Sequence, residues 1–328
     1  MILRYCLFAA LIVTAAACAP RGVPSFVDPV ESATIEELYA VVQRSAEDGE
    51  FGFGADRTDE KIYRSIYVSI PPVHERGQIE WPRSAQPDPA KHFGITATQR
   101  FDEKADFFAK LRRIPGDSVM IQVHGYNTNP TEALYRLAQI RHDYDIEIPT
   151  IAFIWPSAAE LRGYVYDTDS ALFARDALLE LIRDINRFTG KKAAIAGHSL
   201  GTFLVMETLR QNDLQTGPRI ADRVSGVFLL APDLDPDLFE AQLSVLDPVP
   251  QPFLVLAAEA DPALKVSTIL RGTETRVGQI TNEARWAEFG VDVVNLTEFS
   301  RTASNPHSIA ATSAVAIAFL VEFFSTVF

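Results

Sequence analysis

The chain has 328 residues, of which 47% are hydrophobic and 22% are charged, and its formal net charge is −13. This is the composition of an ordinary globular protein, and it excludes an intrinsically disordered, collagen-like or coiled-coil chain. The acidic balance argues against nucleic acid as a partner, because phosphate binding needs a surplus of Lys and Arg on one face. The only cysteines are Cys6 and Cys18, so a disulfide framework in the body of the protein is excluded.

The first seventeen residues have the layout of a secretory signal peptide. Arg4 supplies the positive charge, Leu7–Val13 forms a short apolar run, and small residues follow. A membrane-spanning helix needs about 20 apolar residues, so this run is too short to span. We therefore predict a signal peptide at residues 1–17 that is removed from the mature protein.

The residues that end this segment resemble a bacterial lipobox, the signal in which a cysteine is diacylated and becomes the new N-terminus. Ala15-Ala16-Ala17-Cys18 departs from the usual pattern at Ala15, where most lipoboxes have Leu. The alternative is an ordinary cleavage site with an incidental Cys18. We predict lipidation of Cys18 and, because Ala19 rather than Asp follows, a place on the periplasmic side of the bacterial outer membrane.

After Cys18 the chain is rich in proline, and we expect a lipidated N-terminus and tether over residues 18–49 and one catalytic domain over residues 50–328. The domain begins with two runs that predict an antiparallel strand pair, Ile62–Pro71 and His92–Thr98. A helix is expected next, at Asp102–Arg113.

From residue 115 onward, short apolar runs alternate with helix-length amphipathic segments. The runs are apolar throughout, as in strands that are buried on both faces of a parallel sheet. The alternation predicts an α/β protein with a mostly parallel, doubly wound sheet and helices on both faces. The predicted strands are Ser118–His124, Thr150–Trp155, Ala193–Gly197, Val224–Ala231, Phe253–Ala258 and Val291–Leu296, and the predicted helices are Thr131–His142, Thr168–Phe188, Leu200–Gln211 and Ser308–Phe324.

The last of these helices is conspicuously apolar and could be taken for a membrane segment. Its apolar part covers only the 14 residues from Ser308 to Val321. That length is too short to span a bilayer and fits a buried terminal helix.

One pentapeptide contains the predicted reactive side chain. Gly197-His198-Ser199-Leu200-Gly201 matches the pattern G-x-S-x-G, and it lies between a predicted strand and a predicted helix, as a nucleophile elbow requires. The glycines allow a tight turn that lifts the Ser199 hydroxyl above the sheet edge and over the positive end of a helix. Ser199 is therefore the predicted nucleophile.

The histidine partner follows by elimination. Where a serine occupies such a turn, an acid and then a histidine follow it in the chain. The chain has six histidines, and His307 is the only one after Ser199. It lies in a loop after the last predicted strand, so we predict that His307 is the general base.

The acid has two candidate positions. Asp261 follows the predicted strand Phe253–Ala258, and Asp233 and Asp235 follow the strand before it. An aspartate before proline is also a good helix N-cap, which is an alternative role for Asp261 and Asp235. We favour Asp261 as the acid and keep Asp233 as the alternative.

An oxyanion hole needs two backbone N–H groups aimed at the developing charge. One is expected from Leu200, the residue after the nucleophile. The second is expected from Tyr126, because His124-Gly125 at a strand end lets the backbone approach a substrate closely.

At this point the chain resembles the bacterial α/β-hydrolases of unknown function within the esterase/lipase superfamily. The resemblance extends over residues 50–325. It implies an α/β-hydrolase fold and a Ser-Asp-His hydrolase in which Ser199, Asp261 and His307 are the corresponding residues. Many members have Met after the serine, where this chain has Leu200. The matching stretches are Ser69–Pro71, Val123–Asn127, Ile154–Ser157, Tyr166-Asp167, His198–Gly201, Ala231–Asp235, Asp261–Leu264 and Arg276–Gly278.

Together these features predict a serine hydrolase that cleaves carboxylic esters, including lipid esters, and that a lipid anchor holds at the cell envelope. No metal or other cofactor is expected, because the sequence has neither metal-ligand spacing nor a phosphate-binding glycine loop. No large cap domain is expected, since residues 231–253 are few, and Trp155–Phe173 is the best candidate to shape an acyl pocket. Two alternatives remain open: an amidase, peptidase or thioesterase on the same triad, and a non-catalytic lipoprotein that uses the fold to bind.

Overall fold

The computed structural model describes residues 22–47, 51–82, 86–282 and 284–327. Cys6, Cys18 and the predicted signal peptide lie outside these residues. The described strands form one sheet in the order β3-β2-β1-β5-β4-β6-β7-β8-β9, in which β1, β2 and β3 are antiparallel neighbours and every pair from β1–β5 onward is parallel. The strands are β1 Thr34–Val42, β2 Ile62–Ile70, β3 Gly94–Phe101, β4 Ser118–Val123, β5 Thr150–Ile154, β6 Lys192–His198, β7 Val224–Leu230, β8 Phe253–Ala257 and β9 Val291–Asn295.

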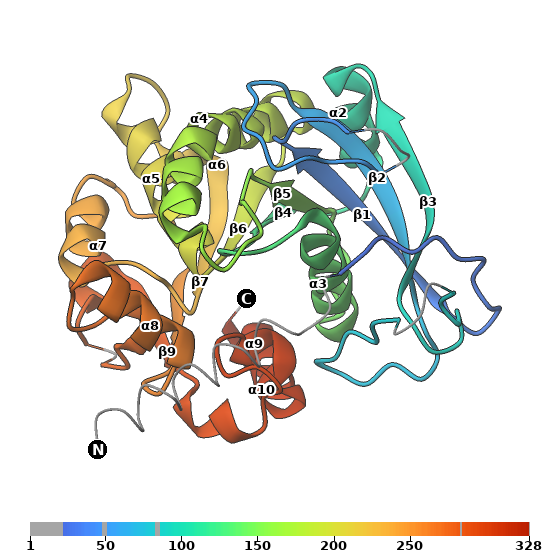
Figure 1. Ribbon diagram of the computed structural model, residues 1–328. Coiled ribbons are helices and arrows are strands. Elements are labelled where there is room, and N and C mark those ends of the chain that lie inside the picture. Colours follow the sequence, from blue (N-terminus) through green and yellow to red (C-terminus); the bar gives the residue numbers. More distant parts are fainter. Residues whose placement is uncertain (1–21, 48–50, 83–85, 283, 328) are drawn as a thin grey trace.

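Helices cover both faces of the sheet (Figure 1), with α2, α4 and α5 on one face and α3, α9 and α10 on the other. This arrangement confirms the predicted doubly wound α/β architecture. The described helices are α2 Lys104–Arg113, α3 Pro130–Asp143, α4 Tyr164–Thr189, α5 Leu200–Leu214, α6 Ile220–Arg223, α7 Pro236–Leu243, α8 Pro262–Arg271, α9 Ile309–Thr312 and α10 Ala314–Val327, with short 3₁₀ helices at Val277–Gln279, Ala287–Phe289 and Thr297–Arg301.

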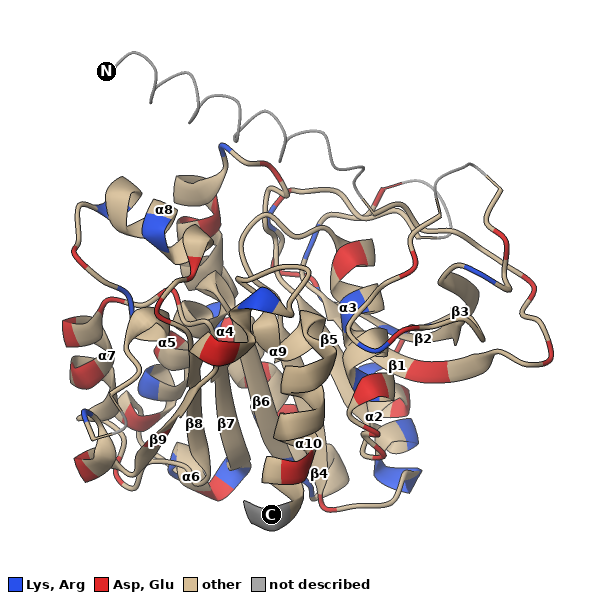
Figure 2. Ribbon diagram, turned by 90° about the horizontal axis from the view of Figure 1, so that it is seen from below, with Lys and Arg blue, Asp and Glu red and all other residues tan. Residues whose placement is uncertain are grey.

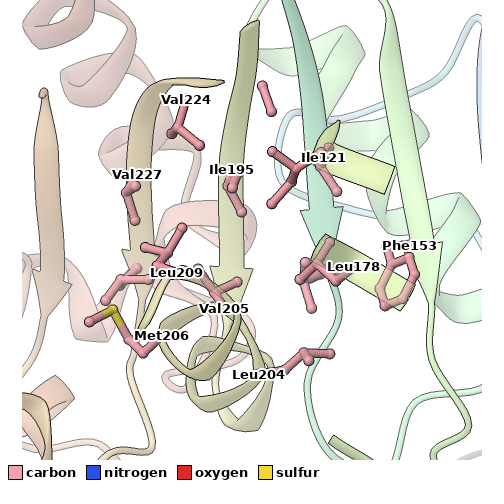
Figure 3. Close-up of a cluster of buried hydrophobic side chains, with 14 of the residues drawn as sticks. Ile121, Phe153, Leu178, Ile195, Leu204, Val205, Met206, Leu209, Val224 and Val227 are labelled. Atoms are coloured by element: carbon pink, nitrogen blue, oxygen red, sulfur yellow. The ribbon is translucent and has the colours of Figure 1, made fainter. Parts of the chain in front are cut away.

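The largest part of the core lies between the sheet and helices α4 and α5. Figure 3 shows Ile195 of β6 at its centre, with Val205 and Leu209 of α5 below it. All five residues of β5 are buried, which is why that run is apolar without alternation. Charged residues lie mainly on the helices and loops around the sheet (Figure 2).

The structure confirms the six predicted strands after residue 115 and the antiparallel pair before it, each to within three residues. The predicted domain boundary at residue 50 is wrong. Residues Thr34–Val42, which were assigned to the tether, form β1, and Leu38–Val42 are almost completely buried between β2 and β5. The sheet therefore begins within the segment that was expected to be a linker.

The C-terminal segment differs from the single buried helix that was predicted. The helix is interrupted at Ser313, which separates α9 from α10. Ala316, Ile317 and Leu320 of α10 are buried, but Val315 is 52% exposed and Phe319 is 41% exposed. Among the helices of the described residues, none is both long enough and apolar enough to cross a bilayer.

Candidate active site

Ser199 lies in the turn between β6 and α5, with φ 52° and ψ −125°. A positive φ is uncommon for a residue with a side chain, and such conformations cluster at functional sites. Hydrogen bonds hold the strained turn on both sides. The Ser199 N–H donates to Leu230 O at 3.0 Å, and Thr202 N and Oγ1 donate to Ser199 O at 3.0 and 2.6 Å. The Ser199 residue is 7% exposed.

Two glycines allow the backbone to close around this serine. A Cβ on Gly201 would lie 2.6 Å from Val123 O and would also meet His124 O. A Cβ on Gly125 would lie 3.0 Å from the Cβ of Ser199. The loop after β4 can therefore approach the serine only because both positions lack a side chain.

His307 and Asp261 come together at the same edge of the sheet. His307 Nδ1 lies 2.7 Å from Asp261 Oδ2, and Asp261 is 1% exposed. The other carboxylate oxygen, Oδ1, accepts hydrogen bonds from Ala263 N at 2.9 Å and Leu264 N at 3.1 Å at the start of α8. Asp261 is thus both a helix N-cap and a partner of His307, and these two roles use different oxygens.

The described residues contain no hydrogen bond between Ser199 Oγ and His307. Such contacts are often long in unliganded sites and shorten only when substrate binds. His198 fixes the main chain of His307, because its Nε2 donates to His307 O at 3.1 Å and its ring lies 4.8 Å from the His307 ring. Burial lowers the pKa of His198 to about 3, so His198 is neutral and its Nε2 carries the proton.

Of the two predicted oxyanion donors, Leu200 directly follows Ser199, and Tyr126 follows Gly125, which lies against Ser199. Leu200 is the first residue of α5, where helix geometry leaves an N–H without an intrahelical acceptor. Tyr126 follows Gly125 in a loop in which Asn127 has φ 54°. The ring of Tyr126 makes an edge contact with Tyr164 at 5.3 Å, and its hydroxyl donates to Leu161 O.

Asp167 holds this loop in place through hydrogen bonds. Its fully buried carboxylate accepts hydrogen bonds from Ser157 Oγ at 2.6 Å, Ala158 N at 2.6 Å and Asn127 N at 3.1 Å. Burial raises the pKa of Asp167 above its usual range. Composition and spacing gave Asp167 no role, and only the Tyr166-Asp167 stretch of the family resemblance pointed to it.

Asp233 has a different set of partners from Asp261. Its Oδ1 accepts from Arg276 Nε at 2.7 Å and from Ser267 Oγ at 2.6 Å, and its Oδ2 accepts from Tyr164 at 2.7 Å. Asp233 and Arg276 are each about 3% exposed. The neighbouring Asp235 caps α7. Of the two acid candidates, only Asp261 is brought to His307, and the pairing of Asp233 with Arg276 had no signal in the spacing of the sequence.

His124 lies beside the site but in an apolar setting. Its ring stacks on Trp155 at 4.8 Å, and burial lowers its pKa to about 3. The neutral ring donates from Nδ1 to Gly125 O at 2.9 Å. Within the described part of the chain, no three His, Cys, Asp or Glu side chains are grouped in a way that could hold a metal ion.

The sequence matches one family model over residues 99–322, which is more than half of the chain. The model describes an alpha/beta hydrolase of unknown function (DUF900), and the chain belongs to this family. Its sheet and flanking helices are accordingly an α/β-hydrolase fold. No curated protein sequence matches the chain.

Several solved structures are similar to the chain at low identity. A predicted CIB-like hydrolase from Thermoplasma acidophilum is 13% identical, with 90% of this chain and 100% of that chain covered and a TM-score of 0.43. A carboxylesterase from Mesorhizobium loti is 16% identical, with 66% and 91% covered and a TM-score of 0.37. One of two fungal esterases from Rhizomucor miehei is 12% identical, with 90% and 82% covered and a TM-score of 0.38. At this level of similarity, no substrate or residue role is transferred from them.

Proposed function

We propose that this member of the α/β-hydrolase family is a serine hydrolase that cleaves carboxylic esters, with Ser199 as nucleophile, His307 as general base and Asp261 as the acid. The observation that carries the proposal is the 2.7 Å contact between His307 Nδ1 and Asp261 Oδ2 at the sheet edge where Ser199 occupies a strained turn. A base that is oriented by a buried carboxylate near a strained serine is the arrangement that nucleophilic acyl transfer requires.

In the first step, His307 Nε2 takes the proton from Ser199 Oγ as this oxygen attacks the ester carbonyl carbon. Asp261 holds the proton of His307 on Nδ1 and stabilises the positive charge that forms on the ring. The backbone N–H groups of Leu200 and Tyr126 donate to the oxyanion. His307 then gives its proton to the leaving alcohol, and an acyl-enzyme remains.

In the second step, His307 takes a proton from water, and the resulting hydroxide attacks the acyl-enzyme carbonyl. The acid leaves, and the proton returns to Ser199 Oγ. Each step needs only water and the residues named, so the proposal includes no cofactor. Asp233 is excluded from the acid role in this proposal because its oxygens accept from Arg276, Ser267 and Tyr164.

Labelling with a fluorophosphonate probe tests the nucleophile. The wild-type protein is expected to be labelled and to hydrolyse p-nitrophenyl esters, and Ser199→Ala is expected to lose both properties. Ser308→Ala is a matched control, because it removes a nearby hydroxyl that contacts His198 rather than the predicted nucleophile. Labelling or turnover that survives in Ser199→Ala would refute the proposal, and a wild-type protein without either would favour a binding module.

The preference for esters is tested with matched p-nitrophenyl esters, thioesters and anilides of equal acyl length. The same triad can serve an amidase or thioesterase, so faster cleavage of either of those substrates would replace the ester assignment. Esters of rising chain length then define the acyl pocket.

We also propose that Cys18 carries a lipid that holds the protein at the cell envelope, on the periplasmic side of the outer membrane. The support is the lipobox-like sequence that ends at Cys18. Cys18→Ser is expected to move the protein from the membrane fraction to the soluble fraction. A Cys18→Ser protein that stays with the membrane would refute the anchor and leave the hydrolase proposal untouched.

A further inference from the structure

A cavity of about 1200 Å³ lies between the sheet and the helices α3 and α10. Ligand pockets in proteins typically measure roughly 300–1,000 Å³, so this space is large enough for a ligand. Ser118 and His124, near the two ends of β4, both line it. A strand rises about 3.3 Å per residue, so the cavity runs for about 20 Å along the sheet.

The walls of this cavity are mainly apolar. Alternation along β4 places Met120 on the cavity face, opposite the core residues Val119 and Ile121. The neighbouring strand β6 presents Ala194 and Ala196 to the cavity, and these small side chains leave the space open, while Gly197 and His198 line it at the end of the strand. Other apolar residues of the wall include Ile140, Phe228, Leu230, Leu256, Val321 and Phe324.

One cationic side chain, Arg136 of α3, also lines the cavity. Its Nη1 donates to Gln139 Oε1 at 2.6 Å and to Ala311 O at 3.0 Å. Within the described ranges, its Nε and Nη2 atoms have no acceptor and its guanidinium has no carboxylate within 4.0 Å. Three of its five N–H donors are therefore left for a ligand.

Burial lowers the pKa of Arg136 to about 10, with Asp143 opposing that effect, so the guanidinium remains charged at neutral pH. Arg136 is only partly buried, and an anion beside it would supply a counter-ion and accept charge-assisted hydrogen bonds from its guanidinium. Of the acidic side chains in the wall, Glu132 accepts from the N–H groups of Gly22 and Asn129, and Asp261 faces His307. Asp145 is exposed.

Two further polar side chains line the cavity with an atom that has no partner. Gln122 is 6% exposed and its Oε1 has no hydrogen-bond partner among the described residues, and the same is true of Nε2 of His124, which is 2% exposed. Both atoms are acceptors, because the proton of the neutral His124 ring is on Nδ1, so they call for a hydrogen-bond donor such as water beside the ligand and not for its carboxylate.

We propose that this cavity binds an amphiphilic carboxylate, with its aliphatic chain along the β4–β6 face and its carboxylate on Arg136. The planar fork of a guanidinium matches the two oxygens of a carboxylate. Ser199 is not among the lining residues, but Tyr126, His198, Asp261 and His307 are, so the cavity adjoins the proposed active site. The proposal does not depend on the proposed hydrolase activity.

Calorimetric titration of the purified full-length chain with dodecanoate and with dodecanol tests this inference. The two probes share the alkyl chain and differ in the charge. Dodecanoate is expected to bind at least about tenfold more tightly than dodecanol. The reason is that a hydrogen bond to a charged group contributes more free energy than the amount that corresponds to a tenfold change in affinity. Equal affinity for the two probes, or no binding of dodecanoate, would overturn the proposal.

Variants then locate the ligand. Arg136→Gln is expected to lose the preference for dodecanoate and to keep the affinity for dodecanol, whereas Arg112→Gln, which removes an exposed charge from α2, is expected to change neither. Ala194→Leu, which fills the cavity beside Met120, is expected to lower the affinity for both probes. An Arg136→Gln protein that still prefers dodecanoate to dodecanol would refute the role of the guanidinium. If this variant does not fold, the comparison of the two probes on the wild-type protein decides whether the cavity selects a carboxylate.

Discussion

Replacing Asp233 by alanine removes one half of a buried ion pair. Arg276 Nε lies 2.7 Å from Asp233 Oδ1, and both side chains are 3% exposed. Without the carboxylate, the guanidinium stays buried without a counter-ion, and Ser267 and Tyr164 lose an acceptor. Breaking a buried pair in this way costs about 3–5 kcal/mol.

The free energy of unfolding measured in urea provides the assay, with Asp235→Ala as the matched control. Asp235 lies two residues away and caps α7 without an ion pair, so its replacement is expected to cost only about 1 kcal/mol. Asp233→Ala is therefore expected to lose several times more stability than Asp235→Ala. Equal losses for the two variants would refute the reasoning.

The same pair of positions separates a structural carboxylate from a catalytic one. Asparagine caps helices as well as aspartate does, so Asp261→Asn should keep the start of α8 and most of the stability. Loss of the charge and of the correct tautomer of His307 is expected to lower kcat by about 10⁴-fold. If Asp233→Asn abolishes turnover at full stability while Asp261→Asn does not, the assignment of the acid is reversed.

Two further variants test the geometry and the electrostatics away from the acid. Gly201→Ala is expected to abolish activity and to cost about 1–3 kcal/mol, because its Cβ would lie 2.6 Å from Val123 O; normal turnover would show that the elbow tolerates a side chain. Burial alone would lower the pKa of His74, but its hydrogen bonds to Asp143 and Glu80 outweigh burial and raise it to about 9. That stabilisation, on the order of 3 kcal/mol, is complete below the unfolded pKa of about 6.5 and is lost as the pH rises through about 9. The free energy of unfolding in urea, measured below pH 6.5 and above pH 9, should fall in the wild type but not in His74→Gln. An equal fall in both proteins would show that His74 is not its cause.

The sequence predicted those features whose cause is local. A parallel strand buried on both faces is apolar throughout, and the Ser199 turn is encoded by two glycines between a strand and a helix. β1 was missed because it follows the proline-rich stretch after Cys18, and its first half carries the charged residues Glu36 and Glu37. Their partners come from distant helices: Arg141 of α3 pairs with Glu36, and Lys110 of α2 pairs with Glu37. No pattern inside residues 34–42 could reveal those pairs.

The choice between two acids was open for the same reason. Asp233 and Asp261 each follow a buried strand, and Asp235-Pro236 beside Asp233 repeats the Asp-Pro pattern of Asp261-Pro262. What separates Asp233 from Asp261 is Arg276, a residue that lies 43 positions after Asp233 in the chain. Tertiary contacts of this kind decide which carboxylate remains available to a histidine, and spacing alone does not contain them.

The ion pair between Asp233 and Arg276 also bears on Ser199. The backbone N–H of Asp233 donates to Ser199 O at 3.3 Å, and the turn that carries Arg276 donates from Gly278 N to Pro232 O at 2.9 Å. The strained turn at Ser199 persists only while its surroundings hold it, and Asp233 is part of those surroundings. Asp233→Ala is therefore expected to lower the fraction of active molecules as temperature rises, while the pH dependence of the remaining activity stays that of the wild type. A shifted pH profile would instead place Asp233 in direct electrostatic contact with the reacting groups.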